Sequence, residues 1–224
     1  MEALLAAEKQ AMALLDAIET AGLIAPGRSE RDVERDIYAL AEQSFGVKQH
    51  WHKRIVRCGI NTLCIAAEDP PVREIAADDT VFLDLGPVFG AWEADVGRTY
   101  AVGTDLRKHK LCTDLEKIFD ALKQHFDIHP DITGAALYAF AQEAAQDAGW
   151  VFGGAIAGHL VGAFPHALIP GDKDLYRISP ANGTRMRDPD ARGEKKYWIL
   201  EVHLVDADRT FGGFYERLLV PAAP

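Results

Sequence analysis

Four carboxylates and one imidazole lie inside or at the edge of apolar, strand-like runs, and they constrain this chain more than any other feature of its sequence. These residues are Asp84 in FLDL, Asp95 in EADVGRT, His159 in GHLVGAFPH, Glu201 in WILEVHL and Glu216 in FYERLLV. Burying such groups is costly unless something compensates for their charge. Two divalent cations would compensate for it, so the residues alone make a two-metal hydrolytic centre the leading hypothesis.

The composition is that of a globular protein and argues against several partners. The 224 residues are 48% hydrophobic and 26% charged, with no linker-like stretch, so we expect a single domain over residues 1–224. The formal charge of −10 disfavours nucleic acid and anionic membrane surfaces. No run is long enough to span a bilayer, and the N-terminus lacks the pattern of a signal peptide. Three cysteines without paired spacing (Cys58, Cys64 and Cys112) fit a reducing cytoplasm.

Hydrophobic periodicity predicts an α+β fold. The expected helices cover 2–21, a segment that starts after Ser29 and ends near Phe45 (so that N-terminal helices fill about 2–45), about 106–126, and about 133–148. The expected strands are 51–57, 62–66, 80–85, 97–103, 198–205 and 213–220. The first two would form a hairpin through Gly59-Ile60-Asn61, and short connections make the sheet antiparallel. The polar segment at about 171–197 is either a plain surface loop or a loop that covers a substrate.

The motifs DLGP, EADVGRT, GHLVGAFPH, ILEVHL and FYERLL, in this order and spacing, resemble those of the pita-bread metallohydrolases. That family includes methionine aminopeptidase, aminopeptidase P, prolidase and creatinase. The resemblance covers roughly residues 54–220 and implies an antiparallel sheet with helices on its outer face. The extra N-terminal domain of aminopeptidase P, prolidase and creatinase has no room here, so in size the chain is closer to methionine aminopeptidase. Because relatives often dimerise, the resemblance also makes a homodimer plausible.

The resemblance implies a role for each of the five residues. Asp84 would chelate one metal, and Asp95 would bridge both. His159 and Glu201 would serve the second metal, and Glu216 would bridge from the last strand. A bridging carboxylate keeps two cations about 3.5–4 Å apart, and water held between them becomes a hydroxide that attacks a carbonyl. Oxygen-rich ligation with one imidazole suits Mn²⁺, Fe²⁺ or Co²⁺, with Zn²⁺ as a further option.

Other residues near these motifs have predicted roles and competing explanations. His166, which follows His159 by seven residues, would donate a hydrogen bond to the substrate carbonyl or its oxyanion; the alternative is a buried histidine satisfied by backbone. Arg98 and Thr99 match the family's Arg-Thr pair, and we expect them to support the metal-binding carboxylates. Glu93, two residues before Asp95, competes with it for the ligand role.

Two histidines that relatives use to handle substrate are missing. Ala66 stands where the peptidases carry one, and Ala155 stands where aminopeptidase P carries another. We therefore expect His52 or His203 to contact the substrate instead. His52 would share one face of an extended strand with His50, and His203 would share the face of Glu201 because it is two residues further along the strand. The alternative for His203 is a core histidine.

Three functions compete on these grounds. The first is a dinuclear metal-dependent hydrolase, most simply an aminopeptidase or Xaa-Pro dipeptidase that acts on a small peptide. The second uses the same metal site for a creatinase-like C–N hydrolysis, or a lyase reaction, on a non-peptide small molecule, and the missing histidines favour it. The third is a binding module without activity, which the five retained ligands disfavour.

Overall fold

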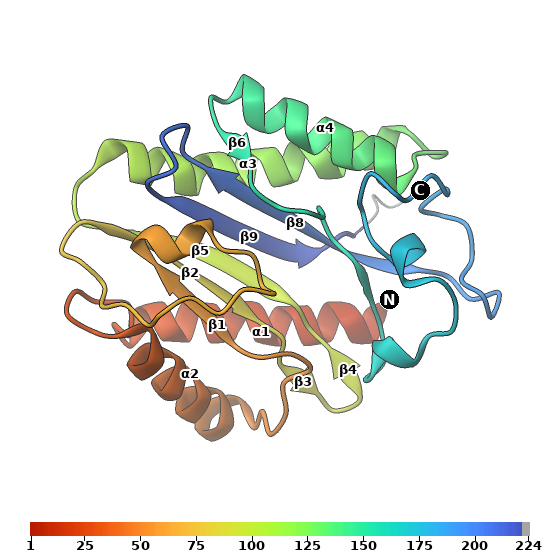
Figure 1. Ribbon diagram of the computed structural model, residues 1–224. Coiled ribbons are helices and arrows are strands. Elements are labelled where there is room, and N and C mark those ends of the chain that lie inside the picture. Colours follow the sequence, from red (N-terminus) through yellow and green to blue (C-terminus); the bar gives the residue numbers. More distant parts are fainter. Residues whose placement is uncertain (221–224) are drawn as a thin grey trace.

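A seven-stranded antiparallel sheet is the framework of the chain, whose computed structural model describes residues 1–220 (Figure 1). The strand order is β1-β2-β5-β9-β8-β6, and β7 pairs with β8 off this path. The strands are β1 (Ile55–Cys58), β2 (Asp79–Leu85), β5 (Val96–Val102), β6 (Val151–Phe152), β7 (Leu160–Val161), β8 (Tyr197–Val205) and β9 (Gly212–Leu218). A short separate ribbon pairs β3 (Val88–Phe89) with β4 (Trp92–Glu93). The predicted α+β class and antiparallel sheet are confirmed.

Helices cover the sheet in two pairs (Figure 1). They are α1 (Glu2–Thr20), α2 (Glu30–Phe45), α3 (Leu106–Ile128) and α4 (Gly134–Asp147). The first pair shares a core with β1, β2 and β5, and the second shares a core with β8 and β9. Leu83 and Val202 face these helices from β2 and β8. Because successive strand residues point to opposite faces, the helix-free face receives their neighbours Asp84 and Glu201.

Two helices begin where the sequence predicts. Ser29 caps α2, where its hydroxyl accepts a hydrogen bond from Asp32 N at 3.1 Å. Thr133 caps α4 in the same way by accepting from Ala136 N at 3.1 Å. Side-chain oxygens at this position satisfy backbone N–H groups that have no partner within the helix.

The predicted hairpin ahead of β2 is wrong. β1 pairs with β2, and a 3-10 helix over Gly59–Leu63 takes the place of the turn and of the start of the second strand. The cause lies in side chains that bind backbone or buried partners instead of continuing a ladder. Asn61 donates to the buried Glu30 carboxylate at 3.0 Å, and the Thr62 hydroxyl donates to Gly59 O.

The polar segment after β7 reaches the helix-free side of the sheet. It contains a 3-10 turn at Lys173–Tyr176 and joins the body of the chain through isolated bridges, such as Arg177 with His159. The predicted loop is therefore confirmed as largely irregular, and Arg177 brings it beside one of the candidate ligands. Within residues 1–220, no helix has both the length and the apolar character that a bilayer crossing requires.

Candidate metal centre

One row of paired residues crosses the helix-free face of the sheet. Backbone pairing aligns Ile55 with Asp84, Asp84 with Gly97, and Gly97 with Glu216. It then aligns Glu216 with Glu201 on the next strand. Directly paired residues project their side chains to the same face. The register therefore collects carboxylates from β2, β9 and β8 on one surface.

Gly97, at the centre of this row, leaves the space that the Phe214 ring and Glu216 Cβ occupy. A Cβ atom added there would lie 2.6 Å from Phe214 Cδ1 and 3.1 Å from Glu216 Cβ. Asp95, just before β5, is only 3% exposed, and its carboxylate belongs to the same cluster. Packing therefore requires glycine at position 97, because a larger residue there would displace β9 beside Glu216.

His159 approaches the cluster from beside β8. Gly158 has φ +137°, and a Cβ atom added to it would lie 2.0 Å from Ile199 O, so only glycine fits. This close approach lets Ile199 N donate to His159 O at 2.8 Å. The His159 Nδ1–H donates to Leu160 O at 2.7 Å, which leaves Nε2 directed at the carboxylates.

Three of the other four predicted ligands meet around this imidazole. His159 Nε2 lies 3.1 Å from Asp95 Oδ2, 3.5 Å from Glu201 Oε1 and 3.8 Å from Glu216 Oε1. Asp84 is linked to Asp95 by His52. The His52 Nε2 lies 3.3 Å from Asp84 Oδ1 and 3.1 Å from Asp95 Oδ1. The cluster therefore holds all five predicted ligands and one additional histidine.

The donor atoms of the cluster fit divalent cations. Two groups have their donor atoms within 4.8 Å of one another: His52, Asp84 and Asp95 form one, and Asp95, His159 and Glu216 form the other. Asp95 is common to both groups. Glu216 Oε2 is buried without a hydrogen-bond partner, which is costly for a carboxylate oxygen unless a cation satisfies it. Oxygen and imidazole donors suit several first-row metals.

Burial makes three of the carboxylates reluctant to ionise. It raises the pKa of Asp84 to about 6 and that of Glu201 to about 7. It also raises the pKa of Glu216 well above the usual glutamate range, and the charges of Asp95 and Asp84 add to that rise. Their charged forms are disfavoured because they are poorly solvated and repel one another.

Asp95 and the two histidines behave in the opposite way. Burial alone would raise the pKa of Asp95, but hydrogen bonds from His159 and His52 outweigh it and lower that pKa to about 2. Burial alone would lower the pKa of each histidine, but the hydrogen bond and charge of Asp95 raise both to about 9. The metal-free cluster therefore contains an ionised Asp95 between two imidazolium groups.

These shifts predict a metal-free protein whose stability falls as the pH rises. The pKa values of Asp84, Glu201 and both histidines are higher in the folded chain than their ordinary values of 3.8, 4.5 and 6.5. Their stabilising contribution is therefore present at low pH and is lost between about pH 4 and pH 9. Because cations replace these protons, Mn²⁺ should raise the Tm of chelator-treated protein more at pH 8 than at pH 6. Thermal unfolding followed by circular dichroism measures this, and an equal rise at both pH values would contradict it.

Glu93 binds His166 and not the cluster of candidate metal ligands. Its Oε1 accepts from His166 N at 3.0 Å, and its Oε2 accepts from the His166 Nδ1–H. Both carboxylate oxygens are thus engaged, so the alternative in which Glu93 replaces Asp95 as a ligand is wrong. The His166 ring stacks on that of His159 with 5.7 Å between centroids. Because Nδ1 is engaged by Glu93, Nε2 is the ring nitrogen of His166 that is available to a ligand.

The predicted support of the carboxylates by Arg98 is wrong, and that by Thr99 is indirect. Arg98 follows Gly97, so it points to the opposite face, where it pairs with Asp16 of α1 at 2.8 Å. The Thr99 hydroxyl accepts from Phe214 N at 2.7 Å and donates to Phe214 O at 2.8 Å. Thr99 therefore fixes β9 two residues before Glu216.

The predicted substrate histidines differ in their surroundings. His203 shares the face of Glu201, as predicted, but its Nε2–H donates to Thr62 O at 2.8 Å, and burial lowers its pKa. His50 and His52 precede β1 and lie outside any strand, so the extended segment predicted for them is wrong. The His50 ring instead lies near the Tyr38 ring, with 6.2 Å between the two ring centroids. Contact of His203 or His52 with substrate stays a prediction.

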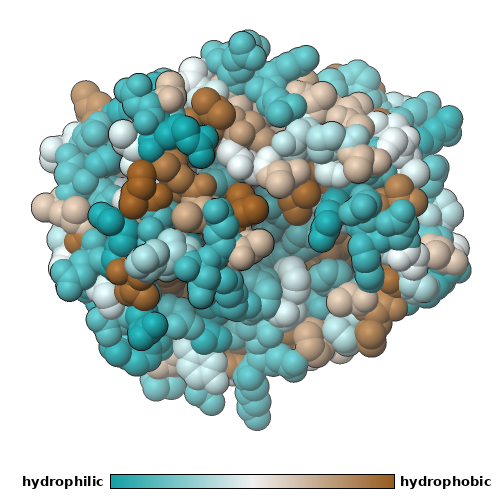
Figure 2. Space-filling model, viewed as in Figure 1, coloured by the Kyte–Doolittle hydropathy of each residue, from teal (hydrophilic) through white to brown (hydrophobic). Residues whose placement is uncertain are grey.

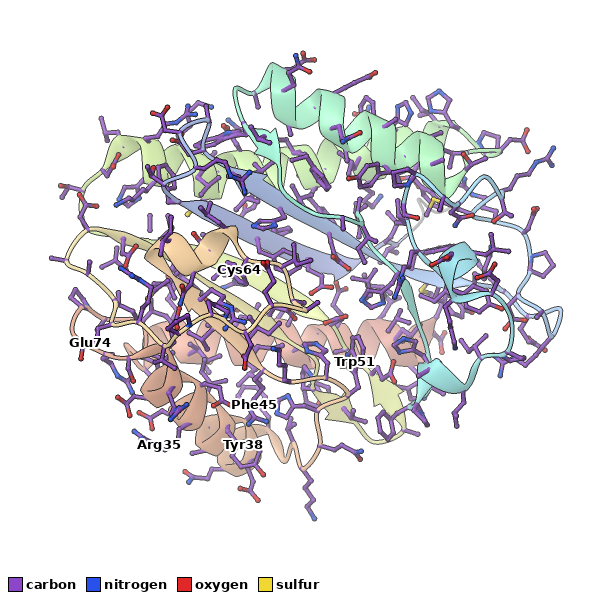
Figure 3. All side chains as sticks on the ribbon, viewed as in Figure 1. Arg35, Tyr38, Phe45, Trp51, Cys64 and Glu74 are labelled. Carbon is purple, nitrogen blue, oxygen red and sulfur yellow. The ribbon has the colours of Figure 1, made fainter. Side chains whose placement is uncertain are left out.

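A cavity of about 480 Å³ opens over the candidate ligands. The molecular surface is mostly hydrophilic and is hollowed near the middle of the view in Figure 2. Trp51 and Cys64 line this cavity and lie in front of the sheet, whereas Arg35 and Tyr38 lie away from it on α2 (Figure 3). Arg177 from the polar segment also lines it.

Part of the apolar lining of the cavity was missing from the sequence prediction. Phe82, Phe214 and Ile156 contribute to it, as do Ala66 and Ala155. The two phenylalanines each precede a ligand by two residues, so strand alternation would have placed them on the ligand face. The two alanines add space where relatives are expected to have imidazoles.

Comparison with known proteins agrees with this geometry. The model of metallopeptidase family M24 matches residues 2–189, a range that includes Asp84, Asp95 and His159. No curated protein sequence matches the chain. Prolidase from Thermococcus sibiricus superposes with a TM-score of 0.72 at 20% identity, over 100% of this chain and 60% of that one. The chain thus spans about 60% of the length of that prolidase.

Two further structures of related type share the fold. X-Pro aminopeptidase from Thermotoga maritima has a TM-score of 0.68 at 18% identity, over 100% of this chain and 62% of that one. Methionine aminopeptidase from Thermotoga maritima has a TM-score of 0.67 at 17% identity, over 96% of this chain and 94% of that one. The predicted pita-bread fold is therefore confirmed, and the chain belongs to metallopeptidase family M24.

Proposed function

We propose that the chain is a dinuclear metal-dependent hydrolase that acts on a small peptide, as an aminopeptidase or an Xaa-Pro dipeptidase. One observation carries the proposal: Asp95 is shared by two groups of potential ligands at the floor of a cavity of about 480 Å³. A shared carboxylate is the feature that holds two cations close together. Membership of family M24 supports a peptide as substrate.

Each part of the site has a distinct task in this proposal. Asp84, Asp95, His159, Glu201 and Glu216 would hold two divalent cations. When bound, such cations would supply an activated water and Lewis acidity toward a carbonyl group. His166 is oriented by the buried Glu93 through two hydrogen bonds, and when both of its ring nitrogens carry a proton, the Nε2–H donates to the carbonyl oxygen as that oxygen gains charge. Phe82 and Phe214 exclude bulk water from the cavity.

A second candidate keeps the metal site and changes the substrate. Ala66 and Ala155 both line the cavity at positions where the resemblance implies substrate-handling histidines. A chain without those imidazoles suits a creatinase-like C–N hydrolysis, or a lyase reaction, on a non-peptide small molecule. The same five ligands would serve that chemistry.

Metal analysis and a substrate panel test both candidates. Protein purified without chelator should contain close to two transition-metal ions per chain, drawn from Mn²⁺, Co²⁺, Fe²⁺ and Zn²⁺. Turnover of Met-Xaa or Xaa-Pro peptides supports the first candidate, and turnover of amidino or N-methyl compounds alone supports the second. Less than one ion per chain, together with no affinity for added Mn²⁺ or Co²⁺, would overturn both.

We also propose a cytoplasmic location and a homodimer for this hydrolase. Cys58, Cys64 and Cys112 are all free, which suits a reducing compartment. Dimer formation follows from analogy with relatives. Sedimentation of the purified protein tests the second point.

A further inference from the structure

His52 reaches the metal-binding cluster from a segment outside the sheet. Its Nε2 lies 3.3 Å from Asp84 Oδ1 and 3.1 Å from Asp95 Oδ1, and its side chain is 19% exposed. The resemblance to known hydrolases assigns this residue no metal role, and strand alternation cannot place it here because it belongs to no strand. We propose that His52 is a sixth metal ligand, which binds the cation held by Asp84. This inference rests on the proposed two-metal function.

The hydrogen bond at the other ring nitrogen prepares His52 for this role. Its Nδ1 lies 2.6 Å from Lys53 O, and since a carbonyl only accepts, Nδ1 carries the proton. In the neutral ring, Nε2 then presents its lone pair to the carboxylates. His159 is arranged in the same way, with its Nδ1–H bound to Leu160 O at 2.7 Å. Metal-binding histidines in general donate the second N–H to such a partner.

The two imidazoles lie on opposite sides of Asp95. His52 contacts Asp95 Oδ1, and His159 contacts Asp95 Oδ2. Each of the two ligand groups therefore combines one imidazole, the shared Asp95 and one more carboxylate, which is Asp84 in the first and Glu216 in the second. The two cation positions are thus matched in donor type, whereas without His52 one of them would have oxygen donors alone.

The surroundings of His52 are built to hold its ring in place. A Cβ atom added to Gly86 would lie 2.3 Å from His52 Cδ2 and 2.5 Å from Trp51 Nε1, so glycine is needed for both side chains. Trp51 N donates to Gly86 O at 2.9 Å, and Trp51 Nε1 donates to Ala94 O at 3.2 Å. The Trp51 ring then meets the His52 ring edge-on, with 4.3 Å between centroids. A fixed ring suits a metal ligand better than a side chain that must adapt to a substrate.

A second imidazole also changes the expected metal preference. Imidazole suits Zn²⁺ and Fe²⁺ as well as Co²⁺, whereas donor sets of oxygen alone suit Mn²⁺ and Mg²⁺. The cation at Asp84 should therefore bind Co²⁺ or Zn²⁺ more tightly than Mn²⁺. Replacing His52 by alanine should reduce that preference at one of the two positions.

Calorimetric titration of Co²⁺ into chelator-treated protein tests the role of His52. The wild-type chain should bind two ions, and His52→Ala should weaken one of them by at least about tenfold, the lower limit seen when partners of metal ligands are lost. His50→Gln is the matched control, because His50 is two residues away and packs near Tyr38 outside the cluster. It should leave both affinities unchanged.

A second measurement needs no variant and so does not depend on the folding of one. In the Co²⁺-loaded wild-type chain, proton NMR should contain two strongly shifted, exchangeable imidazole N–H signals, one each from His52 and His159. A single such signal, or a His52→Ala chain that keeps both affinities while its KM rises, overturns the metal-ligand role and leaves the two-metal function standing. A wild-type chain that binds no Co²⁺ overturns the proposed function itself.

Discussion

Replacing Asp95 by asparagine should lower kcat/KM by more than about a hundredfold and reduce the bound metal to at most one ion per chain. The carboxylate is shared by both ligand groups, and its two oxygens face His52 and His159 separately. Asparagine keeps the size but loses the charge and one acceptor oxygen, so it cannot hold two cations. Loss of a direct ligand should exceed the roughly 10–100-fold effect seen for the outer partners of ligands. Steady-state kinetics and metal analysis of the same preparation measure both effects.

Asp16→Asn is the matched control for this substitution. Asp16 lies on α1, pairs with Arg98 and has 68% of its side chain exposed. The same chemical change at this exposed position should leave kcat/KM and metal content within about twofold. Retention of two ions and of full turnover by the Asp95→Asn chain would falsify the bridging role. Glu216→Ala provides an independent check, since Glu216 is predicted to bridge from the opposite strand.

The candidate ligands could be identified from the sequence because each of them stands out from its local surroundings. Asp84, Glu201 and Glu216 are charged residues inside apolar runs, and strand periodicity predicts that such residues share a face with their neighbours two positions away. The same rule places His203 beside Glu201 and would have found Phe82 and Phe214. The helices were predicted for a similar reason, since the caps at Ser29 and Thr133 are local signals.

The features that were not predicted from the sequence depend on contacts between distant segments. The row from Ile55 to Glu201 is set by register across five strands, and no local pattern encodes which residues face each other. The hairpin prediction failed because Asn61 binds Glu30, a residue of α2. His52 enters the site because its ring and that of the adjacent Trp51 pack against Gly86, which is distant in the sequence.

The pairing of Glu93 with His166 is a further contact between distant segments, and a large loss of activity is expected when it is removed. His166→Ala should lower kcat by about 10²–10³, the usual loss when one donor to a developing oxyanion is removed. KM and metal content should change little, because the donor acts as the carbonyl oxygen gains charge and because His166 is not one of the grouped ligands. Steady-state kinetics on the best substrate of the panel, with metal analysis alongside, measures the effect.

Glu93→Gln tests whether Glu93 orients the His166 ring, because this variant keeps the ring and changes only its partner. The glutamine can still accept from one N–H, but it cannot offer a charged oxygen to both His166 N and Nδ1, so kcat should fall less than in the His166→Ala chain. The double variant should be no slower than His166→Ala alone, because Glu93 acts only through the ring that is then missing. Losses that add in the double variant would mean that Glu93 acts independently of His166. His109→Ala removes an exposed histidine at α3 and should leave every parameter unchanged.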